Sequence, residues 1–376
     1  MKYYIIAGEP SGDLHASNLM KALKAQDVEA QFRFWGGDLM KTQGGTLVKH
    51  YRDTAVMGVW DVLTHLGKIR NNFKLCRADI LEHRPDVLIL VDYAGFNLPM
   101  AKFAKRNGIK TFYYIVPKTW ASKEGRNKKI KAYVDKLFTI LPFETQYFAS
   151  KNIDVTYCGN PVMDAIENME NKNESFDDFC RRNNLDERPK VALLAGSRKA
   201  ELKYNLPIML KMVSLFPNYQ FVIAGAPSFT EANYATYLSG YDNVKLVFGQ
   251  TYQLVSQARA ALVTSGTATL ETAILNCPQV VIYRMWGGAF SDFVAHLFIK
   301  SKYISLVNLI LGREAVKELF QKAYSDEKLI SELTSLLSDS DERRKMLADY
   351  DELRSLVGGA GCSNRAAHAM ISELMK

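Results

Sequence analysis

Short apolar runs alternate with amphipathic stretches along the first half of the chain. The runs are rich in β-branched and aromatic residues and are bounded by Gly, Pro or Asp, which predicts strands. The stretches between them, such as 14–23 and 66–82, have the spacing of amphipathic helices. The predicted strands cover 3–7, 32–35, 87–92, 111–116, 137–141 and 155–158. This alternation indicates an α/β fold with a mostly parallel sheet and helices on both faces.

A polar segment separates this pattern from a second one. The apolar runs stop between Asp164 and Lys190, where a short helix is expected after a cap at Ser175. Alternating strands and helices then resume, which predicts a second α/β unit. Its predicted strands cover 191–194, 221–224, 244–248, 261–264 and 280–283.

The chain beyond Arg284 is expected to be helical and to contain no further strand. The predicted helices cover 289–300, 312–323, 327–337, 341–357 and 364–375. A length of 376 residues exceeds what one core usually supports, so two domains are expected. The expected segments are a Rossmann-like domain (1–163), a linker (164–189), a second Rossmann-like domain (190–345), and C-terminal helices (346–376) that pack back on the N-terminal domain or on a partner subunit.

Open α/β sheets bind ligands at the carboxyl ends of their strands, so the turns after strands are candidate sites. The first turn reads Ala7-Gly8-Glu9-Pro10-Ser11-Gly12-Asp13. It is not a G-x-G-x-x-G fingerprint, and its two carboxylates would repel a phosphate. Two interpretations stay open. Either Ser11 caps the helix and Asp13 favours its dipole, or Glu9 and Asp13 bind sugar hydroxyls.

Asp92 ends the strand predicted at 87–92 and is followed by a turn that contains Asn97. An acid at the end of a buried strand points into the ligand-binding crevice, where it can act as a general base. A strand-terminal Asp can also be a simple loop cap.

Gly196, Ser197 and Arg198 follow the first strand of the second unit, with Glu201 in the next helix. Backbone donors at a helix start together with an arginine suit a diphosphate. The sequence is neither a P-loop nor a nucleophile elbow.

A further turn in the second unit combines small hydroxyl residues, glycine and an acid. It comprises Ser265, Gly266, Thr267, Ala268, Thr269 and Glu271. A capped helix alone would explain the hydroxyl residues. Gly266 and Glu271 instead favour a nucleotide site in which the acid reaches a ribose diol.

Composition excludes several classes of protein. Hydrophobic residues make up 48% of the chain and charged residues 23%, which is typical of a folded globular protein. A net charge of +8 suits phosphate-bearing partners but does not choose among nucleotides, nucleic acid and anionic lipid. No stretch has the length of a signal core or of a membrane span, so we expect a protein that is neither exported nor embedded in a bilayer.

Metal and disulfide chemistry are not expected. The six histidines show no H-x-H or H-E-x-x-H spacing. The five cysteines are scattered and form no C-x-x-C pair, which indicates reduced thiols in the cytosol. His15, one helical turn after the first loop, could face a ligand.

Two apolar and basic segments allow contact with a membrane surface. One contains Val56, Met57 and Trp60 before a helix with interleaved Lys and Arg, and the other covers 285–303. Such a pattern resembles an interfacial anchor. An ordinary amphipathic helix packed on a sheet has a similar pattern, so both interpretations stay open.

Taken in order, these motifs resemble the lipid-A-disaccharide synthase family of inverting glycosyltransferases. The resemblance covers essentially the whole chain. It rests on the first turn (7–13) and on Ala55-Val56-Met57-Gly58, Leu141-Pro142-Phe143-Glu144, Gly196-Ser197-Arg198, the 265–271 turn, Tyr303-Ile304-Ser305-Leu306-Val307-Asn308 and Gly312-Arg313-Glu314. It implies a GT-B fold, in which two Rossmann-like domains face a central cleft and the C-terminal end is helical.

The resemblance also implies an activity. Such enzymes join UDP-2,3-diacylglucosamine to 2,3-diacylglucosamine 1-phosphate (lipid X), giving a β-1,6-linked disaccharide and UDP in lipid A biosynthesis. No cofactor, metal or nucleic acid is implied. The implied setting is the cytoplasmic face of the inner membrane of a Gram-negative bacterium, with a peripheral homodimer whose C-terminal parts are swapped.

The resemblance assigns roles to particular residues. Arg198 and the 265–271 turn would hold the diphosphate and ribose, with Arg284 and Asn308 completing the pocket. Asp92 would be the general base, with Glu9 and Asp13 lining the cleft. Asn97, Val56, Met57 and Trp60 would lie on the acceptor and membrane side.

The chain departs from the family pattern at five positions. A common second acid is replaced by Gly95, and a usual histidine by Asn160. The other departures are Val116 and Ser122, in a run that usually reads Ser-Pro-x-x-Trp-Ala-Trp, and Val307, where proline is usual. The acceptor side is the part affected. Two alternatives remain, namely another GT-B enzyme that uses UDP-GlcNAc (an epimerase or a cell-wall transferase), or a non-catalytic nucleotide-binding or lipid-binding homologue.

Overall fold

A computed structural model describes residues 1–54, 66–284 and 302–376. The chain forms two compact units. The first comprises Met1–Asp164 and Gly359–Lys376, and the second comprises Ala165–Gly358. The expected bounds differ from these at the C-terminal end. The expected boundary between 345 and 346 falls inside helix α18 (Asp341–Val357), which lies wholly in the second unit, and the chain returns to the first unit at Gly359.

The first unit is built on a parallel sheet of 7 strands in the order β3-β2-β1-β4-β5-β6-β7. The strands are β1 (Lys2–Ala7), β2 (Gln31–Gly36), β3 (Thr46–His50), β4 (Val87–Val91), β5 (Lys110–Tyr114), β6 (Lys136–Thr139) and β7 (Val155–Tyr157). The helices are α1 (Pro10–Gln26), α2 (Asp38–Thr42), α3 (Tyr51–Thr54), α5 (Leu66–His83), α6 (Ala94–Arg106), α7 (Arg126–Tyr133), α8 (Glu144–Ala149), α9 (Pro161–Glu167) and α19 (Cys362–Leu374). Helix α9 crosses the boundary between the units at Asp164.

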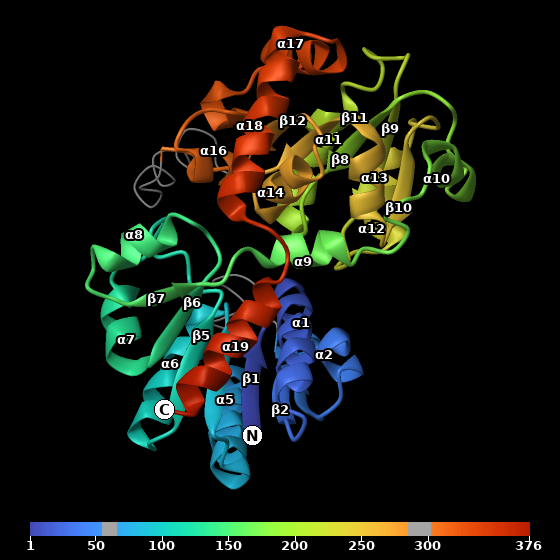
Figure 1. Cartoon of the computed structure of the whole chain (residues 1–376). Coiled ribbons are helices and arrows are strands. Elements are labelled where there is room, and N and C mark those ends of the chain that lie inside the picture. The colour runs from blue at the N-terminus through green and yellow to red at the C-terminus, as the bar shows by residue number, and fades with distance from the viewer. Residues whose placement is uncertain (55–65, 285–301) are drawn as a thin grey trace. The chain divides into compact units, whose positions relative to one another are not determined.

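Alternate residues of β1 enter two separate cores. Tyr3, Ile5 and Ala7 pack with α1 and α19 on one face, and Tyr4 and Ile6 pack with α5 and α6 on the other. Figure 1 shows α19 lying beside α1 over the sheet. Both faces are therefore covered, which explains why the central strands read as continuous apolar runs.

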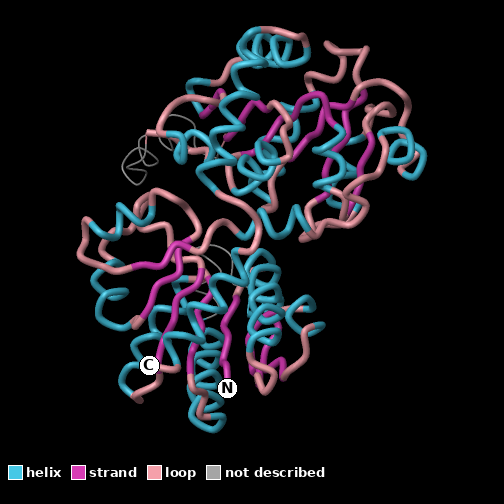
Figure 2. The backbone as a smooth tube through the Cα atoms, in the orientation of Figure 1, coloured by secondary structure: helices cyan, strands magenta, loops and turns pink. Residues whose placement is uncertain are grey.

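The second unit is a parallel sheet of 6 strands in the order β10-β9-β8-β11-β12-β13, with helices around it (Figure 2). The strands are β8 (Lys190–Leu194), β9 (Gln220–Gly225), β10 (Lys245–Phe248), β11 (Ala258–Thr264), β12 (Gln279–Tyr283) and β13 (Lys317–Phe320). The remaining helices are α10 (Phe176–Arg182), α11 (Lys199–Leu210), α12 (Glu231–Leu238), α13 (Thr251–Gln257), α14 (Thr267–Ile274), α16 (Leu306–Leu311), the 3₁₀ turn η1 (Gln321–Ala323) and α17 (Asp326–Leu337).

The predicted strands all coincide with observed strands to within a few residues, and the cap at Ser175 is confirmed by its hydrogen bond from Asp178 N (3.1 Å). Two expectations were wrong. The helix predicted over 312–323 is instead the strand β13 followed by η1, and β3 was not predicted. Both missed strands lie at sheet edges and contain charged or polar residues beside their few apolar ones, so no long apolar run marks them. The helix predicted over 289–300 lies outside the described residues.

Candidate active site

Each sheet reverses its strand order at one point. The turns that carry the candidate site residues, called the loaded turns below, follow the two strands that flank this point. In the first sheet, β1 and β4 are neighbours, and Glu9 and Asp92 come after them. In the second sheet, β8 and β11 are neighbours, followed by the 196–198 and 265–271 turns. Ligands of open α/β proteins bind outside the carboxyl ends of strands at such points. The structure thus brings the predicted turns together in pairs, one pair in each unit.

The Asp92 turn is held in a strained backbone conformation. Asp92 (φ 43°), Tyr93 (φ 46°) and, at the end of the next strand, Ile115 (φ 61°) all lie in the left-handed region. Non-glycine residues in this region cost about 1–3 kcal/mol each and gather at functional sites. The Asp92 N–H donates to the Ile115 carbonyl at 3.2 Å, so the two strained segments support each other.

Two buried side chains hold the backbone of the Asp92 turn in place. The Asp92 carbonyl accepts hydrogen bonds from the Asn97 amide (2.8 Å) and from the Tyr113 hydroxyl (2.5 Å). Burial raises the pKa of Tyr113 well above its usual value, so this hydroxyl remains a donor. Asn97, expected on the acceptor side, is fully buried here and supports the Asp92 backbone.

The two turns of the first unit pack directly on each other. A Cβ atom at Gly8 would come within 2.3 Å of the Tyr93 ring, so this position requires glycine. Burial, and then the Glu9 carboxylate, raise the pKa of Tyr93, which indicates that Glu9 lies near this ring. Glu9 is exposed and precedes α1. Of the two open interpretations of this turn, the one in which Ser11 caps the helix is wrong, because the helix begins earlier, at Pro10, whose fixed φ suits a first helical position.

Asp13 has a structural partner that its sequence position did not reveal. The side chain is 2% exposed, and its carboxylate accepts hydrogen bonds from the backbone N–H groups of Gly37 (2.7 Å), Leu39 (3.1 Å) and Met40 (3.1 Å). It therefore caps the N-terminus of α2 and not that of its own helix. Asp13 fixes β2 and α2 relative to the first turn.

His15 lies in α1, and its Nδ1 atom has no hydrogen-bond partner among the described residues. Burial lowers its pKa to about 4, and Asp164 opposes this shift. The unfolded chain, with a histidine pKa near 6.5, therefore binds more protons than the folded chain between these values. The stability that the neutral imidazole supplies is complete above pH ~6.5 and is lost as the pH falls toward ~4.

We expect His15→Leu to reduce the acid sensitivity of the fold. Between pH 7 and 5 the wild-type free energy of unfolding should fall by on the order of 2 kcal/mol because of this group, and the variant should lack that loss. Thermal midpoints at the two pH values measure the difference. His368→Leu removes an exposed histidine from α19 and is the matched control. Equal acid sensitivity of wild type and His15→Leu would contradict the assignment.

In the second unit, the 196–198 turn exposes the Arg198 side chain, and two of its backbone N–H groups already donate hydrogen bonds within the fold. Glu201 accepts hydrogen bonds from the N–H groups of Ser197 (2.9 Å) and Arg198 (3.2 Å), and it pairs with the Arg198 guanidinium at 2.9 Å. Gly196 has φ +100°, and a Cβ there would come within 2.5 Å of the Glu201 carboxylate. The exposed Arg198 side chain, and not the helix start, is therefore the candidate anion-binding group of this turn.

The second loaded turn leaves its helix start open. Gly266 precedes α14, where no described side chain caps the N-terminus, and Thr267 is exposed. The positive end of a helix is a suitable place for a phosphate. Ser265 and Thr269 instead bind the 304–306 segment, since Ser265 Oγ donates to Ile304 O (2.8 Å) and Thr269 Oγ1 accepts from Leu306 N (3.2 Å).

Glu271 lies one turn into α14 and accepts a hydrogen bond from the Tyr252 hydroxyl of α13 at 3.0 Å. Burial raises the pKa of Glu271, and this hydrogen bond opposes the shift. Ala268, between the helix start and Glu271, is half-buried, and its carbonyl accepts from Thr272. Tyr252 gave no signal in the sequence, because it lies on a different helix.

Asn308 is saturated with hydrogen bonds inside the fold. Its oxygen accepts from the N–H groups of Ala315 (2.7 Å) and Val316 (2.9 Å), and its amide donates to the Val316 carbonyl and to Glu318, both at 2.8 Å. The side chain is fully buried. Asn308 therefore shapes the loop between α16 and β13 from inside the fold.

Glu318 of β13 accepts several hydrogen bonds in this region, although nothing in the sequence singled it out as a site residue. It accepts hydrogen bonds from Ile304 N (3.0 Å), Ser305 N (2.9 Å), Ser305 Oγ (2.7 Å) and Asn308 Nδ2 (2.8 Å). The strand that carries it was itself taken for a helix, which hid the contact. Glu318 locks the 304–308 segment to the edge of the sheet.

Arg284 follows β12 and is exposed, with its guanidinium 5.3 Å from the centre of the Tyr324 ring. Its backbone N–H donates to the buried Asn205 side chain in the middle of α11 (2.8 Å), which links this helix to the end of β12. An aromatic ring under a guanidinium holds the cation in place, while the N–H groups at its edge can still donate hydrogen bonds. Arg284 is a second cation at the carboxyl edge of this sheet.

Other residues singled out in the sequence lie outside the described part of the chain or away from the loaded turns of the second unit. Val56, Met57 and Trp60 lie outside the described residues. Gly95 is exposed at the start of α6, and Asn160 is buried, with its amide donating to Ile140 O (3.1 Å). In residues 1–54, 66–284 and 302–376, no group of three or more His, Cys, Asp or Glu is placed to hold a metal ion. No helix in that same part of the chain has both the length and the hydropathy needed to cross a membrane.

Glu144, at the carboxyl edge of the first sheet, is a buried carboxylate that only the family resemblance had marked. It accepts hydrogen bonds from Ile140 N (3.2 Å), Leu141 N (3.1 Å) and Trp120 Nε1 (3.1 Å). Burial raises its pKa. Because Trp120 also packs edge-on against Phe143, this acid fixes the loops after β5 and β6.

Comparisons with known proteins find relatives over nearly the whole chain. A family model described as lipid-A-disaccharide synthetase matches residues 3–372. Lipid-A-disaccharide synthase of Syntrophus aciditrophicus is 35% identical over 99% of this chain and 97% of its own. That of Trichlorobacter lovleyi is 33% identical over 98% and 96%.

A solved structure of low sequence identity supports the fold alone. The putative UDP-N-acetylglucosamine 2-epimerase of Listeria monocytogenes has a TM-score of 0.70 and 12% identity, covering 99% of this chain and 96% of its own. The architecture is of the GT-B type, as expected. The match over residues 3–372 and the two full-length relatives above 30% identity identify the chain as a member of the lipid-A-disaccharide synthetase family.

Proposed function

We propose that this chain transfers 2,3-diacylglucosamine from UDP to the 6-hydroxyl of 2,3-diacylglucosamine 1-phosphate, giving the β-1,6-linked disaccharide 1-phosphate of lipid A and UDP. Membership of the family supports the reaction. The observation that carries the residue assignment is the pairing of loaded turns at both switch points: a strained acid in one unit, and a cation with an open helix start in the other.

Asp92 is the general base of the proposed reaction. Its carboxylate takes the proton of the acceptor 6-hydroxyl as that oxygen attacks C1 of the donor sugar. The bond between C1 and the diphosphate oxygen breaks, and attack from the face opposite UDP gives the β configuration. A base near the reacting hydroxyl typically contributes 10²- to 10⁴-fold to the rate. Glu9, exposed beside Tyr93, is the second acid available to bind acceptor hydroxyls, while Asp13 positions this turn through α2.

The second unit stabilises the departing UDP. Negative charge builds up on the diphosphate as the bond to C1 breaks, and Arg198, Arg284 and the start of α14 supply positive charge where it develops. Glu271, half-buried beside Tyr252, accepts hydrogen bonds from the ribose hydroxyls. Gly196, Ser197, Ser265, Gly266, Thr267, Ala268 and Thr269 build the turns that hold these groups.

Asn308 and Glu318 act as positioning residues in this proposal. Glu318→Gln should weaken UDP binding about tenfold or more, because a neutral amide cannot accept hydrogen bonds from all of its present donors, and a lost charged hydrogen bond is worth about 1.5–3 kcal/mol. UDP titration by calorimetry measures the effect. Glu314→Gln, at an exposed acid with one 3.4 Å ion pair to Lys317, is the matched control.

A purely structural role of Glu318 would lower the thermal midpoint and leave the UDP dissociation constant of the folded fraction unchanged. That result would remove Glu318 from the site.

A comparison of donors tests the proposed specificity. Wild-type protein should turn over UDP-2,3-diacylglucosamine and should neither transfer nor epimerise unacylated UDP-GlcNAc. Product analysis by mass spectrometry and NMR distinguishes the outcomes. Epimerised UDP-ManNAc, or a product made from UDP-GlcNAc, would replace the proposal with another GT-B activity. Normal binding without turnover of any donor would indicate a non-catalytic homologue.

The acyl chains of both substrates place the proposed reaction at a membrane surface, at its cytoplasmic face, with the protein bound peripherally. The proposed assembly is a homodimer with swapped C-terminal parts. Light scattering of the purified chain measures the assembly, and a monomer at all concentrations would rule it out. Flotation with lipid vesicles measures membrane binding, and no binding in the presence of substrate would rule out the peripheral site.

A further inference from the structure

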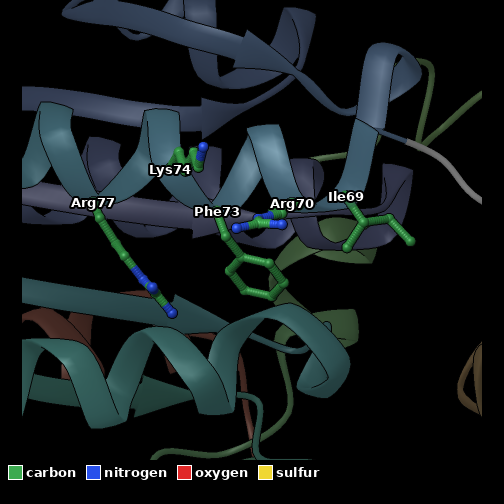
Figure 3. A pocket seen from close by; sticks show the side chains of 5 residues that line it. All are labelled: Ile69, Arg70, Phe73, Lys74 and Arg77. Atoms are coloured by element: carbon green, nitrogen blue, oxygen red, sulfur yellow. The ribbon is translucent and has the colours of Figure 1, made fainter. Parts of the chain in front are cut away.

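A depression of about 550 Å³ is lined by five residues of helix α5, namely Ile69, Arg70, Phe73, Lys74 and Arg77. Figure 3 shows the Phe73 and Arg77 side chains extending from α5 toward the neighbouring α6. The three cations are exposed, and Ile69 and Phe73 are half-buried. The pocket therefore combines positive charge with an apolar wall.

The residues that line this pocket carry positive charge and no negative charge. Among the described residues, no acid lines the pocket, and none of Arg70, Lys74 and Arg77 makes an ion pair with a carboxylate. By contrast, Asp79 of the same helix pairs with Arg33 of β2. Arg70 and Lys74, like Lys74 and Arg77, are neighbours on a helix, where like charges destabilise it. An anionic ligand would relieve this repulsion.

The Arg77 guanidinium is already fixed by aromatic contacts in a position that suits an anionic ligand. Its guanidinium lies over two rings, 5.7 Å from the centre of Phe73 and 5.6 Å from that of Phe103. Stacking fixes the plane of the guanidinium and leaves its N–H edge free to bind a phosphate through two hydrogen bonds. Less side-chain entropy is then lost when the anion binds.

A column of aromatic rings joins this pocket to the proposed base. Phe73 stacks on Phe96 at 4.5 Å with an interplanar angle of 14°, and Phe96 stacks on Tyr93 at 5.7 Å. Tyr93 is the residue after Asp92. The basic pocket and the residue next to Asp92 are thus linked by a continuous stack of rings inside the first unit, the unit proposed to hold the acceptor.

We propose that this pocket binds the 1-phosphate of the acceptor sugar, with Arg70, Lys74 and Arg77 as the phosphate ligands and Ile69 and Phe73 against an acyl chain. The inference rests on the proposed function. It explains why cations and apolar groups occur in one pocket, since the acceptor is both a phosphate monoester and an amphiphile. It also gives the chain a means of telling the acceptor from an unphosphorylated sugar lipid.

The test uses an acceptor with and without its 1-phosphate, both with short acyl chains so that no vesicle is needed. Two variants remove cations, Arg70→Ala/Lys74→Ala and Arg77→Met, the latter retaining an apolar stem over the rings. Each should raise KM for the phosphorylated acceptor about tenfold or more, because charged hydrogen bonds to phosphate are lost. KM for the unphosphorylated acceptor, KM for the donor and kcat should stay within about twofold.

Lys68→Ala is the matched control. It removes one cation from the same helix at a position two residues from Arg70, about 200° around the axis and outside the pocket. Unchanged thermal midpoints in all variants would show that the fold is intact.

Three results would overturn the inference: an equal loss with both acceptors, no change with either, or a loss seen only in binding to vesicles that contain anionic phospholipid. The last would assign the pocket to a membrane surface. Calorimetric titration with the short-chain acceptor phosphate reports binding without turnover. If wild type binds it through these cations but releases no UDP with any donor, the proposed function fails while the pocket assignment stands.

Discussion

Replacing Asp92 with asparagine is expected to lower kcat by about 10²- to 10⁴-fold, the usual contribution of a general base. The amide cannot take the proton of the acceptor hydroxyl. The turn should keep its shape, since it is held through the Asp92 backbone by Ile115, Asn97 and Tyr113 and not through the carboxylate alone. Initial rates of UDP release, together with UDP binding by calorimetry, measure the two quantities.

The affinity of Asp92→Asn for UDP should equal that of wild type, because UDP is assigned to the other unit. Asp154→Asn, at an exposed acid before β7, is the control and should keep full activity. Retention of more than about one tenth of the wild-type kcat by Asp92→Asn would show that the base lies elsewhere.

Arg198→Ala is expected to lower kcat/KM for the donor by about 10²- to 10³-fold, the range found when one donor to a developing negative charge is removed. The reason is specific to this turn. Glu201 accepts hydrogen bonds from the N–H groups of Ser197 and Arg198 and pairs with the Arg198 guanidinium, which is the exposed positive charge of this turn and is proposed to contact the diphosphate. Arg198→Lys should recover part of the rate, because it restores the charge but not the bidentate geometry.

Arg181→Ala provides a close match for this substitution. The exposed side chains of Arg181 and Asp178, three residues apart in α10 of the same unit, pair at 3.0 Å, as Arg198 pairs with Glu201. Loss of that pair should leave activity unchanged. If Arg198→Ala loses no more than Arg181→Ala does, Arg198 is only a surface ion pair.

The central part of the fold was predictable because it depends on local pattern. Buried parallel strands such as β4 (Val87–Val91) are covered on both faces and therefore appear as continuous apolar runs. The edge strand β13 (Lys317–Phe320) has no such run and was taken for a helix. Its identity depends on pairing with β12, which no local window contains.

The positions of the loaded turns were also predictable, since the carboxyl ends of strands follow from the strand assignment. The partners of their side chains were not. Asp13 caps α2 through Gly37 and its neighbours, and Asn308 is saturated by the 315–316 backbone and Glu318. Each of these contacts joins segments whose approach depends on the folded chain. Residue type therefore indicated where chemistry occurs, but not which side chains build the site.

The most direct test of the account is UDP release by the purified chain with defined substrates. UDP should appear at a steady rate only when UDP-2,3-diacylglucosamine and 2,3-diacylglucosamine 1-phosphate are both present, and one β-1,6-linked disaccharide 1-phosphate should form for each UDP. Release of UDP at the same rate without the acceptor, or no release with both substrates, would contradict the assigned reaction.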